Sequence, residues 1–180
     1  RLSGLADARL RRRLGPDGRP VAGKAAADAE GMVLLPPAPG AERGTWLVAV
    51  ESGRKLLAYA DGDDGPAGAP LFVRTPPRFA YLVRRGGLEA LAVAPAGSPV
   101  AGHLFVFQET VLDGERDIRG WRGEPVAPGD RDAGKAPACG FRPIHVVARD
   151  GYAVTGAAFL PGGDLLLLER RWRGGLDIAM

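Results

Sequence analysis

The chain contains a repeated pair of apolar segments, and this repeat restricts the possible fold more than any other feature. Each copy has a polar residue, a small residue, an apolar run, a proline-initiated turn, a second apolar run and a closing glutamate. The copies begin at Glu30, Glu89 and Thr155, at intervals of about 60 residues. A helical pattern would not keep both apolar runs and both polar ends in phase, so each copy predicts a β-hairpin.

The apolar runs are almost uninterrupted, which indicates strands that are buried on both faces. The chain also has 27 Gly and 16 Pro residues, which excludes a bundle of long helices. Hairpins buried on both faces that recur at this period are typical of radially arranged propeller blades. We therefore predict an all-β chain that forms an incomplete β-propeller, with about three blades of antiparallel four-stranded sheet.

The repeat also divides the chain into blades. We predict one partial propeller domain over residues 1–180, about half of a complete ring of about four to eight blades. It consists of the end of a preceding blade (1–27), two blades (28–85 and 86–152) and the start of a further blade (153–180).

The outer strands of the two complete blades are less distinct in the sequence. We expect them at Lys55–Ala60, Leu71–Thr75, Asp117–Trp121 and Ile144–Ala148. The turn-rich segment Asp61–Pro70 is expected to be a surface loop, because it is rich in Gly, Pro and Asp.

Composition excludes several classes of function. The net charge is only +3, with both signs interspersed, which argues against a nucleic-acid-binding protein. The single cysteine, Cys139, excludes an internal disulfide framework and a thiolate zinc cluster. No run of about 18 apolar residues predicts a membrane-spanning helix. Gly129–Ala136 lacks the final hydroxyl of a phosphate-binding P-loop, and no serine lies in the GxSxG motif of hydrolases.

Acidic residues recur at both ends of the repeated hairpins. Glu30 and Glu89 precede the first strands, and Glu51, Glu109 and Glu169 close the second strands. The first strand of each propeller blade lines the central channel, so these carboxylates are expected to converge near the axis. Clustered carboxylates repel one another, and a hard cation such as Ca²⁺ relieves this repulsion while accepting their oxygens. Thr155 replaces the opening glutamate in the third copy, so the predicted ring of acids is incomplete there.

The same glutamates also have a structural interpretation. A glutamate at the end of a strand can cap a hairpin or pair with a nearby base such as Arg54, Lys55 or Arg170. Both interpretations stay open at the level of the sequence.

Several segments resemble the phytase-like domain family, also called "esterase-like activity of phytase". The resemblance runs from about Leu5 to Trp172 and is carried by the segments Gly4–Gly31, Ala27–Pro36, Gly86–Pro95 and Gly156–Trp172. It implies a bacterial β-propeller of hydrolase-like type. It also implies a periplasmic or secreted location, because the family occurs mostly in exported proteins.

By similarity to calcium-dependent propeller phytases, the resemblance implies hydrolysis of phosphate esters or related esters of small molecules. Glu89 and Glu30 are the candidate catalytic residues, and Arg170 is the candidate for binding substrate phosphate. We expect the complete protein to be a monomer. The candidate calcium ligands are Asp28, Glu30, Glu51, Glu89, Glu109 and Glu169.

Catalysis itself is left open by the sequence. One alternative is a propeller module that binds a ligand or an ion without turnover. Another is a sugar-lactonase-type propeller enzyme, which also places glutamates near a channel metal. Assays on phosphate esters and on lactones, with and without a chelator, would separate these functions.

Overall fold

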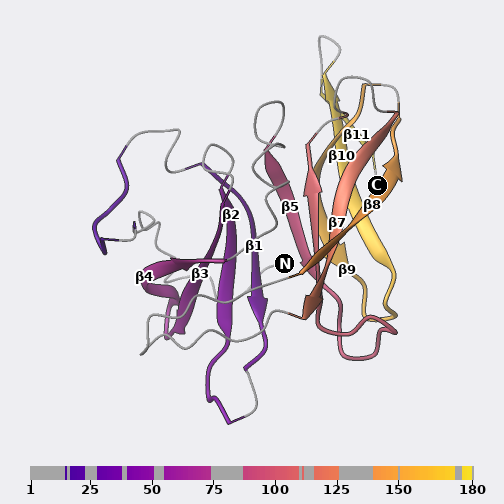
Figure 1. Cartoon of the computed structure of the whole chain (residues 1–180). Coiled ribbons are helices and arrows are strands. Elements are labelled where there is room, and N and C mark those ends of the chain that lie inside the picture. Colours follow the sequence, from indigo (N-terminus) through magenta and orange to yellow (C-terminus); the bar gives the residue numbers. More distant parts are fainter. Residues whose placement is uncertain are drawn as a thin grey trace, which may run out of the picture.

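Figure 1 shows the computed structural model of the chain. It describes residues 15, 17–22, 28–37, 40–50, 55–73, 87–109, 111, 116–125, 140–149, 151–172 and 176–179. Within these residues every regular element is a β-strand, and every pair of neighbouring strands is antiparallel. No helix in this part of the chain is long and apolar enough to cross a membrane.

The first sheet is a four-stranded meander that begins with the first copy of the repeat. Its strands are β1 (Ala29–Leu35), β2 (Thr45–Val50), β3 (Lys55–Gly62) and β4 (Gly65–Phe72). They follow one another in the order β1-β2-β3-β4, so that each strand pairs with its neighbour in sequence. Simple hairpin connections explain this order, because sequential antiparallel strands need only short turns.

The second sheet repeats the same topology. Its strands are β5 (Leu88–Val93), β6 (His103–Gln108), β7 (Asp117–Pro125) and β8 (Phe141–Val147), in the order β5-β6-β7-β8. The two four-stranded sheets are therefore successive copies of one structural unit, as the sequence repeat predicts.

The third sheet has three described strands. They are β9 (Ala153–Phe159), β10 (Leu165–Trp172) and β11 (Leu176–Ala179), with β10 between the other two. The β9–β10 turn contains Gly163, whose φ of +94° lies in the left-handed region that glycine adopts without strain.

The first and second sheets pack face to face. The shared core contains Leu47 and Ala49 from β2, Leu91 from β5, and Leu104 and Val106 from β6, all of them buried. Strand β1 also contacts β5 directly, and Figure 1 shows these two strands facing each other in the middle of the molecule. The two sheets are therefore stacked with their first strands adjacent.

The second and third sheets pack in the same way. Alternate residues of β6 point to this second core, where Phe105 and Phe107 meet Val154 from β9 and Leu167 from β10. The rings of Phe105 and Phe159 form an edge-to-face contact with their centroids 5.1 Å apart. Strand β5 contacts β9 as well as β1, so the first strands of successive sheets lie next to one another. This arrangement confirms the predicted all-β class and is consistent with an incomplete propeller.

Strand β4 corrects the expected position of an outer strand. The sequence predicts a loop over Asp61–Pro70, but β3 continues to Gly62, and β4 begins at Gly65 after a two-residue turn. Proline is tolerated in β4 because this strand is last in the sheet order, and one of its edges has no partner strand among the described residues. Of the strand expected at Leu71–Thr75, residues 74 and 75 lie outside the described residues.

The outer strands of the second sheet are also longer than expected. Strand β7 extends to Pro125 rather than Trp121, and β8 begins at Phe141 rather than Ile144. Glycines in β7 weaken its sequence signal, yet Gly120 has a packing role. A Cβ atom there would lie 2.7 Å from the Phe107 ring, so the glycine makes room for this buried side chain.

Much of the segment assigned to a preceding blade, residues 1–27, lies outside the described residues. The predicted blade boundaries at residues 28, 86 and 153 stay a prediction.

Candidate functional site

Each of the three first strands has a β-bulge at the residue that opens the sequence repeat. In β1, Glu30 is an extra residue between two successive pairs of the β1–β2 ladder. Glu89 in β5 and Thr155 in β9 are extra residues in the same way. The sequence places these residues just before the strands, whereas the structure places them within the strands, at equivalent bulges.

The bulges change which face of the strand each neighbouring side chain occupies. Leu88 and Leu91 both belong to the core between the first and second sheets, although they are three residues apart. In a regular strand they would point to opposite faces. Val154 and Ala157 share one core in the same way. The extra residue of each bulge, Glu89 or Thr155, therefore does not follow the alternation of core-facing and outward-facing residues. Bulges often redirect a side chain in this way beside an active site.

Backbone contacts bring the starts of these strands together. A Cβ atom on Gly31 would lie 3.3 Å from the carbonyl oxygen of Glu89, so the start of β1 lies against the start of β5. The amide of Val154 donates a 2.9 Å hydrogen bond to the Glu109 carbonyl, and the Glu109 amide donates a 3.3 Å hydrogen bond to the Gly87 carbonyl. These hydrogen bonds join the start of β9 to the end of β6, next to the start of β5.

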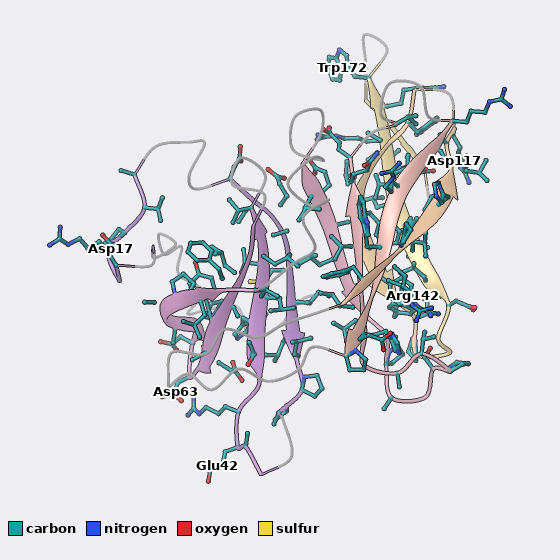
Figure 2. All side chains as sticks on the ribbon, viewed as in Figure 1. Asp17, Glu42, Asp63, Asp117, Arg142 and Trp172 are labelled. Atoms are coloured by element: carbon teal, nitrogen blue, oxygen red, sulfur yellow. The ribbon has the colours of Figure 1, made fainter. Side chains whose placement is uncertain are left out.

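Strands β1, β5 and β9 all begin at the same end of the stacked sheets. We call this end the start end. Figure 2 shows Trp172, near the end of β10, at the top of the molecule, and β10 ends where its partner β9 begins. Glu42 and Asp63 lie at the opposite end of the first sheet (Figure 2). The residues that open the repeat therefore gather at one end of the molecule, while these two acids lie at the other.

The predicted acids differ in burial. Glu89 is buried, with 6% of its surface exposed, whereas Asp28 and Glu30 are half-buried. Glu51, a further candidate ligand, lies outside the described residues.

Glu109 and Arg170 form an ion pair between the second and third sheets. The distance from Arg170 Nη2 to Glu109 Oε1 is 3.7 Å. Glu109 follows β6 and lies opposite Gly87, just before β5, while Arg170 pairs with Ala153 at the start of β9. The two residues thus hold equivalent positions in successive hairpins, and the third hairpin has a base where the second has an acid.

Glu169 does not occupy the position that the sequence spacing indicates. It pairs with Val154 as Gln108 pairs with Leu88, so it is equivalent to Gln108 rather than to Glu109. A shift of one residue turns a side chain to the opposite face of a strand. Glu169 is accordingly buried, and its Oε2 lies 3.4 Å from Nε of Arg149.

Arg149 was missed by the sequence analysis. It lies between β8 and β9, outside the repeated hairpins, and its contact with Glu169 depends on the packing of two sheets. No spacing in the sequence indicates this contact.

The carboxylates have the oxygen chemistry that calcium prefers. Among the described residues, however, no three His, Cys, Asp or Glu side chains form a group that could hold a metal ion. The described part of the chain therefore does not by itself fit a calcium site, and we derive no step through a metal.

Comparison with known proteins was informative at the level of the family. A family model with the description "Phytase-like: Esterase-like activity of phytase" matches residues 1–180. The chain belongs to the phytase-like family. No curated protein and no solved structure gives a significant match to it. The match confirms the family that the sequence segments resemble, and the name of this phytase-like family refers to an esterase-like activity.

Proposed function

We propose that this phytase-like chain is part of a hydrolase of phosphate esters or related esters, with its site at the start end. The observation that carries the proposal is that the bulged residues Glu30 and Glu89 and the Glu109–Arg170 pair all lie at the start end. Membership of the phytase-like family supports ester hydrolysis as the class of reaction.

Each group has a role that its chemistry supports. In hydrolysis a water oxygen bonds to the phosphorus or carbonyl carbon while the bond to the alcohol oxygen breaks. Glu89 or Glu30 accepts the proton of this water, a role that positioned carboxylates perform in general base catalysis. The guanidinium of Arg170 attracts the negative oxygens of a phosphate group, to which arginine can donate two parallel hydrogen bonds.

We propose in addition that the hydrolysis depends on calcium. Glu169 drops out of the candidate ligands because it is held by Arg149. Since the described acids form no group of three, a calcium site would also need Glu51 or other residues outside the described part of the chain. A periplasmic or secreted location and a monomeric state of the complete protein are further parts of this proposal.

The test is hydrolysis of p-nitrophenyl phosphate and p-nitrophenyl acetate, with added calcium and with a chelator. We expect turnover by the chain, and a fall in kcat of about 100-fold or more in Glu89→Gln. The matched control is Glu42→Gln, which removes an exposed acid at the opposite end and should leave kcat unchanged (Figure 2). Equal activity of the two variants, each with an unchanged circular dichroism spectrum, would contradict the assignment of Glu89.

Two outcomes would identify another function. A calcium-dependent rise in melting temperature without turnover of either ester indicates a module that binds ions without catalysis. Turnover of a lactone but not of a phosphate ester indicates a sugar-lactonase-type enzyme. Activity that survives the chelator would remove calcium from the proposal while leaving ester hydrolysis in place.

A further inference from the structure

Successive sheets of the chain meet through the same two faces each time. The core between the first and second sheets joins Leu47 of β2 to Leu91 of β5. The core between the second and third sheets joins Phe107 of β6 to Ala157 of β9 and Leu167 of β10. We call the face that a sheet turns to the next sheet its forward face, and the face that it turns to the preceding sheet its backward face. Both cores therefore join a forward face to a backward face.

The forward face of the third sheet is open to solvent. Leu168 is 39% exposed, whereas the equivalent residue of the second sheet, Phe107, is fully buried. Leu160 is 45% exposed, whereas its equivalent, Ala94, is 2% exposed. The residues that form a core in the second sheet are thus apolar in the third sheet as well, but no further sheet covers them among the described residues.

The backward face of the first sheet has a narrower open area. Met32 and Leu34 of β1 are 54% and 44% exposed, whereas their equivalents in β5, Leu91 and Val93, pack in the core between the first and second sheets. Over β2 this face is closed, since Val48 is only 5% exposed. First strands contact each other directly where successive sheets meet, β1 with β5 and β5 with β9. The open strip along β1 is therefore where the first strand of another sheet would pack.

Gly156 and Met32 are matched across these two open faces. Gly156 is equivalent to Gly31, because each directly follows the bulged residue of its strand. A Cβ atom on Gly31 would lie 3.2 Å from Cγ of Leu91, which is the second residue after the bulge in the next sheet. Among the described residues, a Cβ atom on Gly156 would meet only Leu168 of its own sheet, at 3.5 Å. The place beside Gly156 is thus open, and the residue equivalent to Leu91 in the first sheet is Met32.

We propose that two copies of the 180-residue chain form a closed ring, in which the third sheet of each copy packs its forward face on β1 of the other. This contact continues the stacking that already occurs twice within the chain, and it joins apolar surface to apolar surface. Head-to-tail contacts of this kind form a ring where the rotation closes. Two copies of three sheets make six, within the range of about four to eight sheets that close in propellers.

The ring also has a consequence for the start end. The start of β1 lies against the start of β5 within one copy, so the start of β1 in the second copy would lie against the start of β9. Glu30 of the second copy would then lie near Thr155, and both copies would contribute acids to the start end. A monomeric complete protein would cover both faces with further sheets of its own, as the second copy does here.

The experiment tests the match by disulfide cross-linking in a Cys139→Ser background, followed by non-reducing gel electrophoresis. Cysteines replace Met32 in one variant, Gly156 in a second and both residues in a third. A disulfide requires Cβ atoms about 3.5–4.5 Å apart, which the Gly31–Leu91 contact indicates for this pair. We expect a covalent dimer in the double variant and in a mixture of the two single variants, and none in either single variant alone. Sedimentation velocity of the unmodified chain should show a dimer that dissociates on dilution.

The matched control replaces Gly156→Cys with Gly97→Cys, at an exposed turn position where a Cβ atom has no neighbour within 4 Å. Its mixture with Met32→Cys measures cross-linking by random collision and should give no dimer. Equal cross-linking in this control, or a monomer at every concentration, would overturn the proposal. A dimer of Gly156→Cys alone would show that two third sheets face each other, and a ladder of larger products from the double variant would show an open chain of copies; either result also contradicts the ring. Circular dichroism of each variant verifies that it is folded.

Discussion

Gly31 in β1 and Leu91 in β5 meet so closely that a side chain at position 31 would be in unusually tight contact with β5. A Cβ atom there would lie 3.1 Å from the backbone nitrogen of Leu91 and 3.2 Å from its Cγ. This contact explains why a small residue, Gly31, follows the opening residue of the repeat in the first sheet. It allows the first strands of two stacked sheets to approach each other closely.

Replacing Gly31 with alanine should therefore destabilise the chain. The added methyl group would press on backbone atoms of β5, and overpacking of this kind costs about 1–3 kcal/mol. Urea denaturation would measure the change in the free energy of unfolding. Gly97→Ala is the control, because a Cβ atom there has no neighbour within 4 Å. An equal effect of both substitutions would mean that the β1–β5 contact is looser than described.

Leu47 tests the stacking of the first and second sheets. It is fully buried in their shared core, so Leu47→Ala removes apolar contacts and leaves a cavity, at a cost of about 2–5 kcal/mol. Leu34→Ala on β1 removes the same group from an exposed position and should cost less than about 1 kcal/mol. Thermal and chemical denaturation would compare the two variants. Similar losses of stability would show that the two sheets are not packed against each other at Leu47.

The hairpins and the core could be predicted from the sequence because their signal is local. Apolar runs and a proline-initiated turn determine each hairpin, and the repeat shows that three such units are equivalent. Strand β4 was missed because its Gly, Pro and Ala residues have low strand propensity and pair only as the last strand of a sheet.

The site was predicted less completely because it depends on register and on packing between sheets. The bulges at Glu30 and Glu89 appear only when the two strands of a hairpin are paired, since an extra residue has no signature in one strand alone. For the same reason, the sequence analysis treated Glu169 as equivalent to Glu109, one position away from its structural equivalent Gln108. The contact between Glu169 and Arg149 joins two sheets. Arg149 lies in the segment that connects these sheets, outside the repeated hairpins, so the repeat gives no signal for it.

The Glu109–Arg170 pair should contribute little to stability despite its place at the site. Both side chains are partly exposed, so solvent screens their attraction, and such pairs contribute about 0–1 kcal/mol. A double-mutant cycle with Glu109→Gln and Arg170→Gln would measure the coupling free energy. We expect a value below about 1 kcal/mol that falls as salt is added. A larger coupling that does not respond to salt would indicate that the pair is desolvated.

The face of the third sheet directed away from the second exposes apolar side chains that should promote association. Leu166 and Leu168 hold the ladder positions of Phe105 and Phe107, which in the second sheet are covered by the third. Exposed apolar patches of this kind favour contact with other surfaces. We therefore expect the 180-residue chain to self-associate as its concentration rises, and the double substitution Leu166→Lys/Leu168→Lys to reduce this in sedimentation velocity. Val147→Lys, at another exposed apolar position, is the control, and an equal reduction by this variant would exclude the third sheet as the contact surface.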